Sequence, residues 1–160
     1  MGVVEQTSGA VESQLTSLEE TYGSFSVNQR TVAVPTAQYE RRCGENGCER
    51  IDLYAKIHND AAEVLHVEPE GTTVLPSAET TIDADLEQIA RETVASEAGI
   101  DCRIEGLEAV TILGLQDGAD TDRETVYTLA VLIEGHSTDG TPDSDAVWES
   151  FDAGDHPAYA

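Results

Sequence analysis

The chain has 160 residues, enough for one folding unit, and a strongly acidic composition: 32 acidic and 8 basic residues give a formal net charge of −24. Eight cations are too few to follow a nucleic-acid backbone unless they cluster, so we expect no nucleic-acid partner. No apolar run approaches the roughly 20 residues that span a bilayer, and the N-terminus lacks the basic and apolar regions of a signal peptide, so we expect a cytoplasmic protein without a membrane role.

The first fifty residues predict one helix and one short extended segment. Val11, Leu15, Leu18 and Tyr22 recur at helical spacing, which indicates an N-terminal helix that ends at Gly23. Residues 31–35 are typical of a short extended segment, and a polar loop is expected over residues 43–50. The one cluster of basic residues, Arg41, Arg42 and Arg50, falls in this polar part of the chain.

Alternating apolar and polar residues predict strands after residue 50. Ile51, Leu53, Ala55 and Ile57 alternate with Asp52, Tyr54, Lys56 and His58, which indicates a half-buried strand. Short strands are expected at 64–67 and 73–75, with His66 as a surface or hydrogen-bonded histidine. Further strands are expected at 107–115, 126–134 and 146–151.

A helix is predicted over residues 85–97, between the third and fourth of these strands. Asp85 can cap its N-terminus by accepting hydrogen bonds from the first backbone N–H groups. Leu86, Ile89, Ala90 and Val94 then recur on one face. Gly99 can close the helix, because glycine adopts the left-handed backbone conformation with little strain.

The segment from Leu75 to Ile100 resembles a Nudix box, in which a glycine and a glutamate precede Arg-Glu-apolar-x-Glu-Glu-x-Gly-apolar. Val94, Glu97, Gly99 and Ile100 match the pattern, and Leu75-Pro76 is similar to the family's Leu-Pro-Gly-Gly entry. The remaining signature positions hold other residues, namely Ala78, Ala84, Glu92, Thr93 and Ser96. The order of strands around the box is also similar, so the chain resembles a Nudix protein with a degenerate box.

The resemblance implies a fold and a division of the chain. The fold class is α/β (α+β): a Nudix-like αβα sandwich with a mixed β-sheet, preceded by an N-terminal helix. Residues 51–160 would form the Nudix-like domain, and residues 1–50 would form an N-terminal helix and extension packed on it. The sequence leaves the oligomeric state open, a homodimer included.

The resemblance also implies a metal site with Mg²⁺ or Mn²⁺ as the cofactor of an active enzyme. In working Nudix sites, helix glutamates hold Mg²⁺ against a diphosphate, and Mg²⁺ takes six oxygen ligands. Glu97 is the one retained carboxylate of that set, while Thr93 and Ser96 replace two others. Glu92 is a second candidate ligand if an inserted residue bulges the helix and shifts the alignment by one position.

The acidic segment 117–124, DGADTDRE, lies where Nudix enzymes often place substrate contacts and sometimes a catalytic base. The resemblance therefore makes Glu124 a candidate catalytic base. Asp120, Asp122 and Arg123 are candidate substrate-binding residues. The alternative is a solvated surface loop, which is the usual role of acids in so acidic a chain.

Two classes of function remain open. The first is a hydrolase of nucleoside diphosphates linked to another group, of the ADP-ribose pyrophosphatase or nucleotide pyrophosphohydrolase type, with catalysis weakened or lost. The second is a non-catalytic Nudix module that binds a nucleotide or a protein. Because the box lacks acids in a chain rich in them, the sequence favours weakened or lost hydrolysis.

The three cysteines leave several roles open. Four residues lie between Cys43 and Cys48, and Cys102 stands alone. A structural zinc site would need four ligands, and scattered histidines would have to complete it. Free thiols are favoured over zinc or a disulfide, because the count is odd and no secretion signal is visible.

The charge predicts that stability depends on salt. The net charge is −24 and the chain has a single lysine, Lys56, so its acidic side chains repel one another in dilute buffer. At 1 M salt the screening length falls to about 3 Å, which removes most of that repulsion. The composition is typical of proteins from a salt-loaded cytoplasm.

Overall fold

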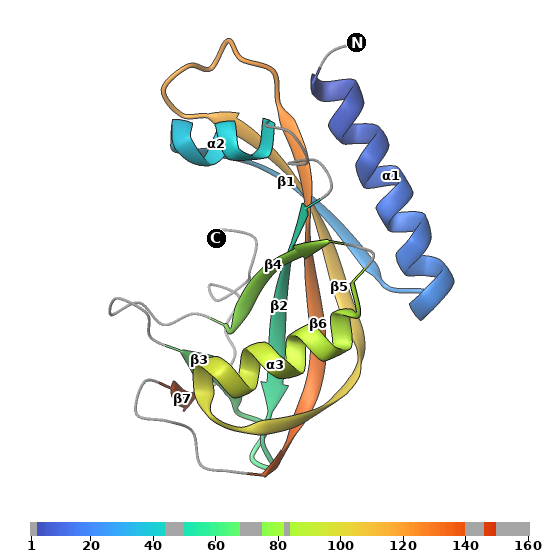
Figure 1. Ribbon diagram of the computed structural model, residues 1–160, viewed down its shortest axis with the longest axis vertical. Helices are drawn as coiled ribbons and strands as arrows, with labels where there is room; N and C mark the ends of the chain where they lie inside the picture. Colours follow the sequence, from blue (N-terminus) through green and yellow to red (C-terminus); the bar gives the residue numbers. More distant parts are fainter. Residues whose placement is uncertain (1–2, 44–49, 68–74, 82–83, 140–145, 150–160) are drawn as a thin grey trace.

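The structure is a computed structural model that describes residues 3–43, 50–67, 75–81, 84–139 and 146–149. Within these residues, three helices flank a seven-stranded mixed sheet (Figure 1). The elements are α1 (Val3–Tyr22), β1 (Ser26–Val34), α2 (Thr36–Cys43), β2 (Arg50–His58), β3 (Val64–Val67), β4 (Ser77–Thr81), α3 (Leu86–Ala98), β5 (Asp101–Asp117), β6 (Val126–Asp139) and β7 (Ala146–Glu149). This is the mixed α/β fold with an N-terminal helix that the sequence predicts.

The sheet has the strand order β1-β5-β6-β2-β3-β7, and β4 pairs with β2 outside this path. β1 runs parallel to β5, and β2 runs parallel to β6. The other pairs are antiparallel. Because β1 is hydrogen-bonded to β5 along its length, part of the first fifty residues belongs to the same sheet as the rest.

Alternation along the strands separates two packed layers. Leu129, Val131 and Ile133 of β6 join the large core under α1 and α3, whereas Val126 and Ala130 face α2. β2 repeats the pattern, since Ile51, Leu53, Ala55 and Ile57 are all buried in the large core, as predicted. α1 and α3 therefore cover one face of the sheet, and α2 covers the other (Figure 1).

Several predicted elements are confirmed, with longer bounds. The N-terminal helix ends at Tyr22 and is closed by Gly23 at φ 77°. The strands predicted at 107–115 and 126–134 extend to 101–117 and 126–139, because the two pair almost throughout. β7 matches the predicted strand over residues 146–149, and residues 150–151 lie outside the described part of the chain.

Other predictions need correction. The extended segment at 31–35 is the end of a longer strand, β1, and a helix, α2, follows it at once. Arg41 and Arg42 therefore lie on a helix rather than in a loop. β4 was not predicted; it forms because its backbone pairs with β2 from Arg50 to Tyr54. Residues 73–74 of the expected strand at 73–75 lie outside the described residues.

His66 is a buried histidine of β3. Its ring is fully buried, and its Nδ1 lies 2.9 Å from the carbonyl oxygen of Val64. β3 lies between β2 and β7, so all four of its residues are buried. Within the described part of the chain, no helix combines the length and the apolar character needed to cross a bilayer.

Candidate functional site

The helix α3 is capped at both ends by the residues that the sequence suggested. Asp85 accepts a hydrogen bond from the backbone N–H of Gln88 at 3.2 Å, and Gly99 adopts a left-handed conformation at φ 73°. The Gly99 N–H donates to the carbonyl oxygen of Ala95 at 3.0 Å. These caps fix the length of the helix, and its buried residues fix its rotation: Leu86, Ala90, Val94 and Ala98.

The side of α3 nearest β4 borders a shallow hollow of about 300 Å³, called here the α3 hollow. The hollow brings together the box residues Glu92, Thr93, Ser96 and Glu97 with Ser77 at the start of β4, and Ile89 completes its lining. The roles of Glu97 and Glu92 as metal ligands stay predictions. Sequence reasoning did not place Ser77 here, because its position follows from the pairing of β4 with β2.

The donor set in the α3 hollow does not fit a tightly held Mg²⁺ ion. Thr93 and Ser96 offer neutral hydroxyls where the family pattern has carboxylates, and Mg²⁺ in protein sites is bound by carboxylates together with waters and phosphate oxygens. Among the described residues, no group of three or more His, Cys, Asp or Glu side chains could hold a metal ion.

Glu92 does not take the position of the missing family glutamate. α3 is a regular α-helix from Leu86 to Ala98, without the bulge that would shift Glu92 by one residue. The Glu92 carboxylate instead accepts a hydrogen bond from Gln88 Nε2 at 2.9 Å, one turn earlier on the same helix. Glu92 still lines the hollow.

Partial burial raises the pKa of Glu97, while a hydrogen bond from the backbone of Ser77 acts in the opposite direction. A raised pKa means that the folded protein holds a proton on Glu97 at a pH where the unfolded chain has lost it. The stabilising contribution of that proton is present below the unfolded pKa and is lost as the pH rises through the folded pKa. At neutral pH the ionised Glu97 therefore costs stability.

We expect Glu97→Gln to raise the melting temperature at pH 7, because it removes a partly desolvated charge next to the negative C-terminal end of α3. The gain should disappear below about pH 4.3, the ordinary pKa of glutamate, where both states are protonated. Thermal unfolding between pH 4 and pH 7 measures it. Glu12→Gln, at an exposed position inside α1, is the matched control for losing one negative charge. An equal gain in both variants would contradict a local effect at Glu97.

The loop between β5 and β6 is fastened to α2 through Asp117. The buried Asp117 carboxylate accepts hydrogen bonds from Thr36 Oγ1 at 2.6 Å, from the Ala119 N–H at 2.9 Å and from Arg123 Nη1 at 3.0 Å. These bonds, that of Thr36 first, lower the pKa of Asp117. Asp117 is thus an ionised anchor for the loop, a role that its position in an acidic run did not reveal.

Arg123 also helps to hold the β5–β6 loop against α2. Its guanidinium lies 4.7 Å from the centre of the Tyr39 ring, and its Nη1 also lies 3.3 Å from Glu40 of α2. Tyr39 in turn donates a hydrogen bond to the carbonyl oxygen of Glu124. The side chains of Asp120, Asp122 and Glu124 are exposed.

The candidate loop residues lie apart from the α3 hollow. In Figure 1 the β5–β6 loop is at the end of the sheet beside α2, while α3 crosses the opposite half. Arg123 is occupied by Asp117, Glu40 and the Tyr39 ring. The roles of Glu124 as a base and of Asp120, Asp122 and Arg123 as substrate contacts therefore stay predictions.

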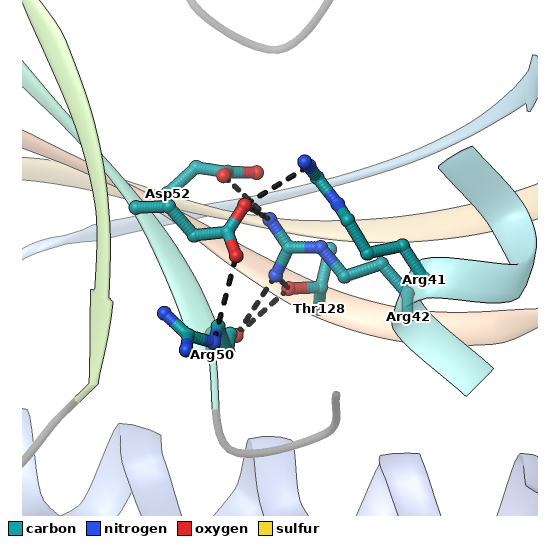
Figure 2. A network of polar contacts seen from close by, with 6 residues as sticks. Arg41, Arg42, Arg50, Asp52 and Thr128 are labelled. Atoms are coloured by element: carbon teal, nitrogen blue, oxygen red, sulfur yellow. Dashed lines mark hydrogen bonds and ion pairs between the residues drawn. The ribbon is translucent and has the colours of Figure 1, made fainter. Parts of the chain in front are cut away.

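A third group of charged residues lies between α2, β2 and β4, and we call it the arginine cluster: Arg41, Arg42, Arg50, Asp52 and Glu79. Figure 2 shows Arg41 and Arg42 reaching from α2 toward the start of β2. Arg42 Nη2 lies 2.6 Å from Asp52 Oδ1, and Arg42 Nη1 donates to the Arg50 carbonyl oxygen and to Thr128 Oγ1, each at 3.1 Å. The sequence pointed to the three arginines, but it could not show that Arg42 is buried against Asp52.

No family model matches the chain, and no curated protein matches it in sequence. Solved structures do match. A UDP-X diphosphatase aligns with a TM-score of 0.50 and 15% identity over 71% of this chain and 57% of its own. A Nudix hydrolase from Nitrosomonas europaea gives 0.48 and 18%, over 68% of this chain and 60% of its own. The Nudix domain of Shewanella oneidensis NrtR, complexed with ADP ribose, gives 0.45 and 14%, over 73% and 84%.

The fold is Nudix-like. The chain spans less than two thirds of the length of the diphosphatase and of the Nitrosomonas hydrolase. At these identities the likeness concerns the fold, and it confirms the αβα arrangement that the sequence predicts. α3 is the helix over the segment whose sequence resembles a Nudix box, and Glu92, Thr93, Ser96 and Glu97 of that segment line the α3 hollow.

Proposed function

We propose that this chain is a Nudix-fold protein that binds a nucleoside diphosphate linked to another group, such as ADP-ribose, and hydrolyses it weakly or not at all. The observation that carries the proposal is the α3 hollow. Glu97 is its one carboxylate at a family ligand position, while Thr93 and Ser96 present hydroxyls. The name of the UDP-X diphosphatase, which has the same fold, describes a substrate of this diphosphate-linked class.

Weak hydrolysis follows from the electrostatics of phosphoryl transfer. That chemistry depends on positive charge that neutralises the developing charge on phosphate oxygens, and in this family a metal supplies it. A single partly exposed carboxylate concentrates Mg²⁺ poorly. The residues that would hold the ion, if it binds together with a diphosphate, are Glu97 and Glu92, because both border the same hollow.

The second candidate function is an active hydrolase, and one observation favours it. Glu92 and Glu97 share the α3 hollow, so a bound diphosphate could complete a ligand set that the protein alone lacks. A loop acid such as Glu124 would then serve as the base, although its loop lies beside α2 (Figure 1). Turnover measurements distinguish the two functions.

We expect the wild-type protein to bind Mg²⁺ or Mn²⁺ weakly and to release little or no product from ADP-ribose, diadenosine polyphosphates or nucleoside triphosphates. Restoring family acids with Thr93→Glu and Ser96→Glu should strengthen divalent-ion binding measured by calorimetry. Ser96→Glu alone should act in the same direction. Ala95→Glu is the matched control, because it adds one exposed acid to the neighbouring position of α3, outside the hollow lining.

Two outcomes would contradict the proposal. Turnover in the usual enzyme range of roughly 1 to 10³ s⁻¹ that Glu97→Gln abolishes would establish the hydrolase. Equal gains in metal affinity from Ser96→Glu and Ala95→Glu would show that general negative charge, rather than the geometry of the hollow, controls metal binding.

A further inference from the structure

Three of the chain's eight cations converge on one carboxylate. Glu79 Oε2 lies 2.9 Å from Arg41 Nη2 and 3.3 Å from Arg42 Nη2, and Glu79 Oε1 lies 3.6 Å from Arg50 Nε. Each guanidinium carries five N–H donors, far more than one carboxylate can accept. The arginine cluster therefore keeps donor groups that Glu79 does not satisfy.

The arginine cluster carries a local positive charge on a strongly acidic molecule. Its three arginines and two acids, Asp52 and Glu79, leave a formal charge of 3 − 2 = +1, whereas the whole chain carries −24. The side chains of Arg41 and Arg50 are 62% and 51% exposed, so a solute can reach them. An anion would meet fewer repulsive charges here than on an average part of this surface.

The position of the Arg42 side chain does not depend on Glu79. Arg42 has a side chain only 3% exposed, and it is held by Asp52, by the Arg50 carbonyl oxygen and by Thr128 (Figure 2). Glu79 is more loosely placed, with its side chain 27% exposed. Its carboxylate can therefore turn away while the buried guanidinium remains in position.

We propose that Arg41, Arg42 and Arg50 form a binding site for the diphosphate group of a nucleotide, and that Glu79 is the internal anion which the diphosphate displaces. Guanidinium groups pair with phosphate oxygens through two parallel hydrogen bonds. A diphosphate has more oxygens than a carboxylate, so it can accept hydrogen bonds from more of the arginine N–H groups. This assignment rests on the proposed function, since it names the part of the protein that recognises the diphosphate.

The site adjoins the α3 hollow through β4. Ser77 lines the hollow, and Glu79 lies two residues further along the same strand, so both sites border β4. The arginine cluster lies on the face of the sheet that α2 covers, whereas the hollow lies beside α3. The arginines supply positive charge that a metal would otherwise bring, so binding should not require Mg²⁺.

Calorimetry in metal-free, low-salt buffer tests the proposal with inorganic diphosphate and with ADP-ribose as separate ligands. Because charge-assisted hydrogen bonds are the strong ones, Arg41→Ala with Arg50→Ala should weaken binding of both ligands by about tenfold or more. The matched control is Arg30→Ala with Arg103→Ala, which removes two exposed arginines elsewhere and should change affinity much less. Glu79→Gln should bind both ligands several-fold more tightly, because the internal competitor has lost its charge.

Equal losses from the two arginine pairs, or binding of ADP-ribose only when Mg²⁺ is added, would overturn the proposal. Weaker binding by Glu79→Gln would overturn the role of Glu79 as a displaceable anion. Binding of diphosphate without ADP-ribose would support the anion site and overturn its assignment to a nucleotide. If Glu79→Gln fails to fold, the comparison of the two double arginine variants still decides whether the arginine cluster binds diphosphate. Turnover that depends on Glu97 tests the proposed function and is measured separately.

Discussion

Replacing Arg42 by alanine is expected to lower the free energy of unfolding by about 3 to 5 kcal/mol, the usual result of removing one partner from a buried ion pair. The Arg42 side chain is 3% exposed, and its Nη2 lies 2.6 Å from Asp52, whose side chain is 12% exposed. The variant leaves the Asp52 carboxylate without this guanidinium beneath α2. For a protein of this size the melting temperature should fall by about 6 to 20 °C.

Two variants show whether the buried charge is the cause. Arg41→Ala removes the neighbouring arginine, which is 62% exposed, and should cost about 1 kcal/mol or less, as exposed ion pairs do. Arg42→Met combined with Asp52→Leu removes both buried charges and should recover most of the loss. If Arg42→Ala and Arg41→Ala unfold at the same denaturant concentration, the Arg42–Asp52 pair does not hold α2 on the sheet.

The second large effect is expected from salt. Raising KCl from 0.1 M to 3 M should raise the melting temperature steeply, because the Debye length shortens from about 10 Å at 0.1 M to below about 3 Å and the repulsion among surplus acids is screened. The formal charge of −24 makes this repulsion large. Ion pairs such as that between Lys56 and Glu108, 2.9 Å apart, offset little of it, because 8 basic residues face 32 acidic ones. Circular dichroism across the salt series measures the change.

Sucrose is the control for the salt series, because it stabilises proteins by exclusion from their surface without screening charge. KCl should stabilise far more than sucrose of the same osmolality, and most of the gain should come below about 1 M, where the screening length changes most. A melting temperature that is unchanged from 0.1 M to 3 M KCl would contradict the salt dependence that the composition predicts.

Local patterns in the sequence predicted much of the fold correctly. The helix over 85–97 is observed at Leu86–Ala98 because its signals are local: Asp85 caps the first turn, Gly99 ends the last, and Leu86, Ala90 and Val94 share a buried face. The alternation in β2 was predictive for the same reason, since successive strand residues face opposite sides. The composition of the α3 hollow also follows from the sequence, because Thr93, Ser96 and Glu97 lie three and four residues apart on one helix.

The sequence did not predict the elements whose formation depends on partners distant along the chain. β4 has the sequence Ser77-Ala78-Glu79-Thr80-Thr81, without alternating apolar residues, and pairing with β2 makes it a strand. α2 begins directly after Pro35 and carries few apolar residues; Tyr39, packed against Leu113 and Leu115, fixes its position. Such contacts cannot be read from local spacing.

The sequence by itself determined the net charge of the protein, the helix at Leu86–Ala98 and the residue types along that helix, because these are properties of composition and of neighbours within one turn. Tertiary structure decided which charges meet. Arg42 and Asp52 are ten residues apart and meet because α2 lies against the start of β2. Arg42 and Glu79 are 37 apart and meet because β4 pairs with β2 at that place. Likewise, Asp117 anchors a loop to Thr36, 81 residues earlier, because β1 runs parallel to β5 and brings α2 beside it. Ion pairs of this kind act over a few ångströms, so the folded backbone, rather than the order of residues, selects them.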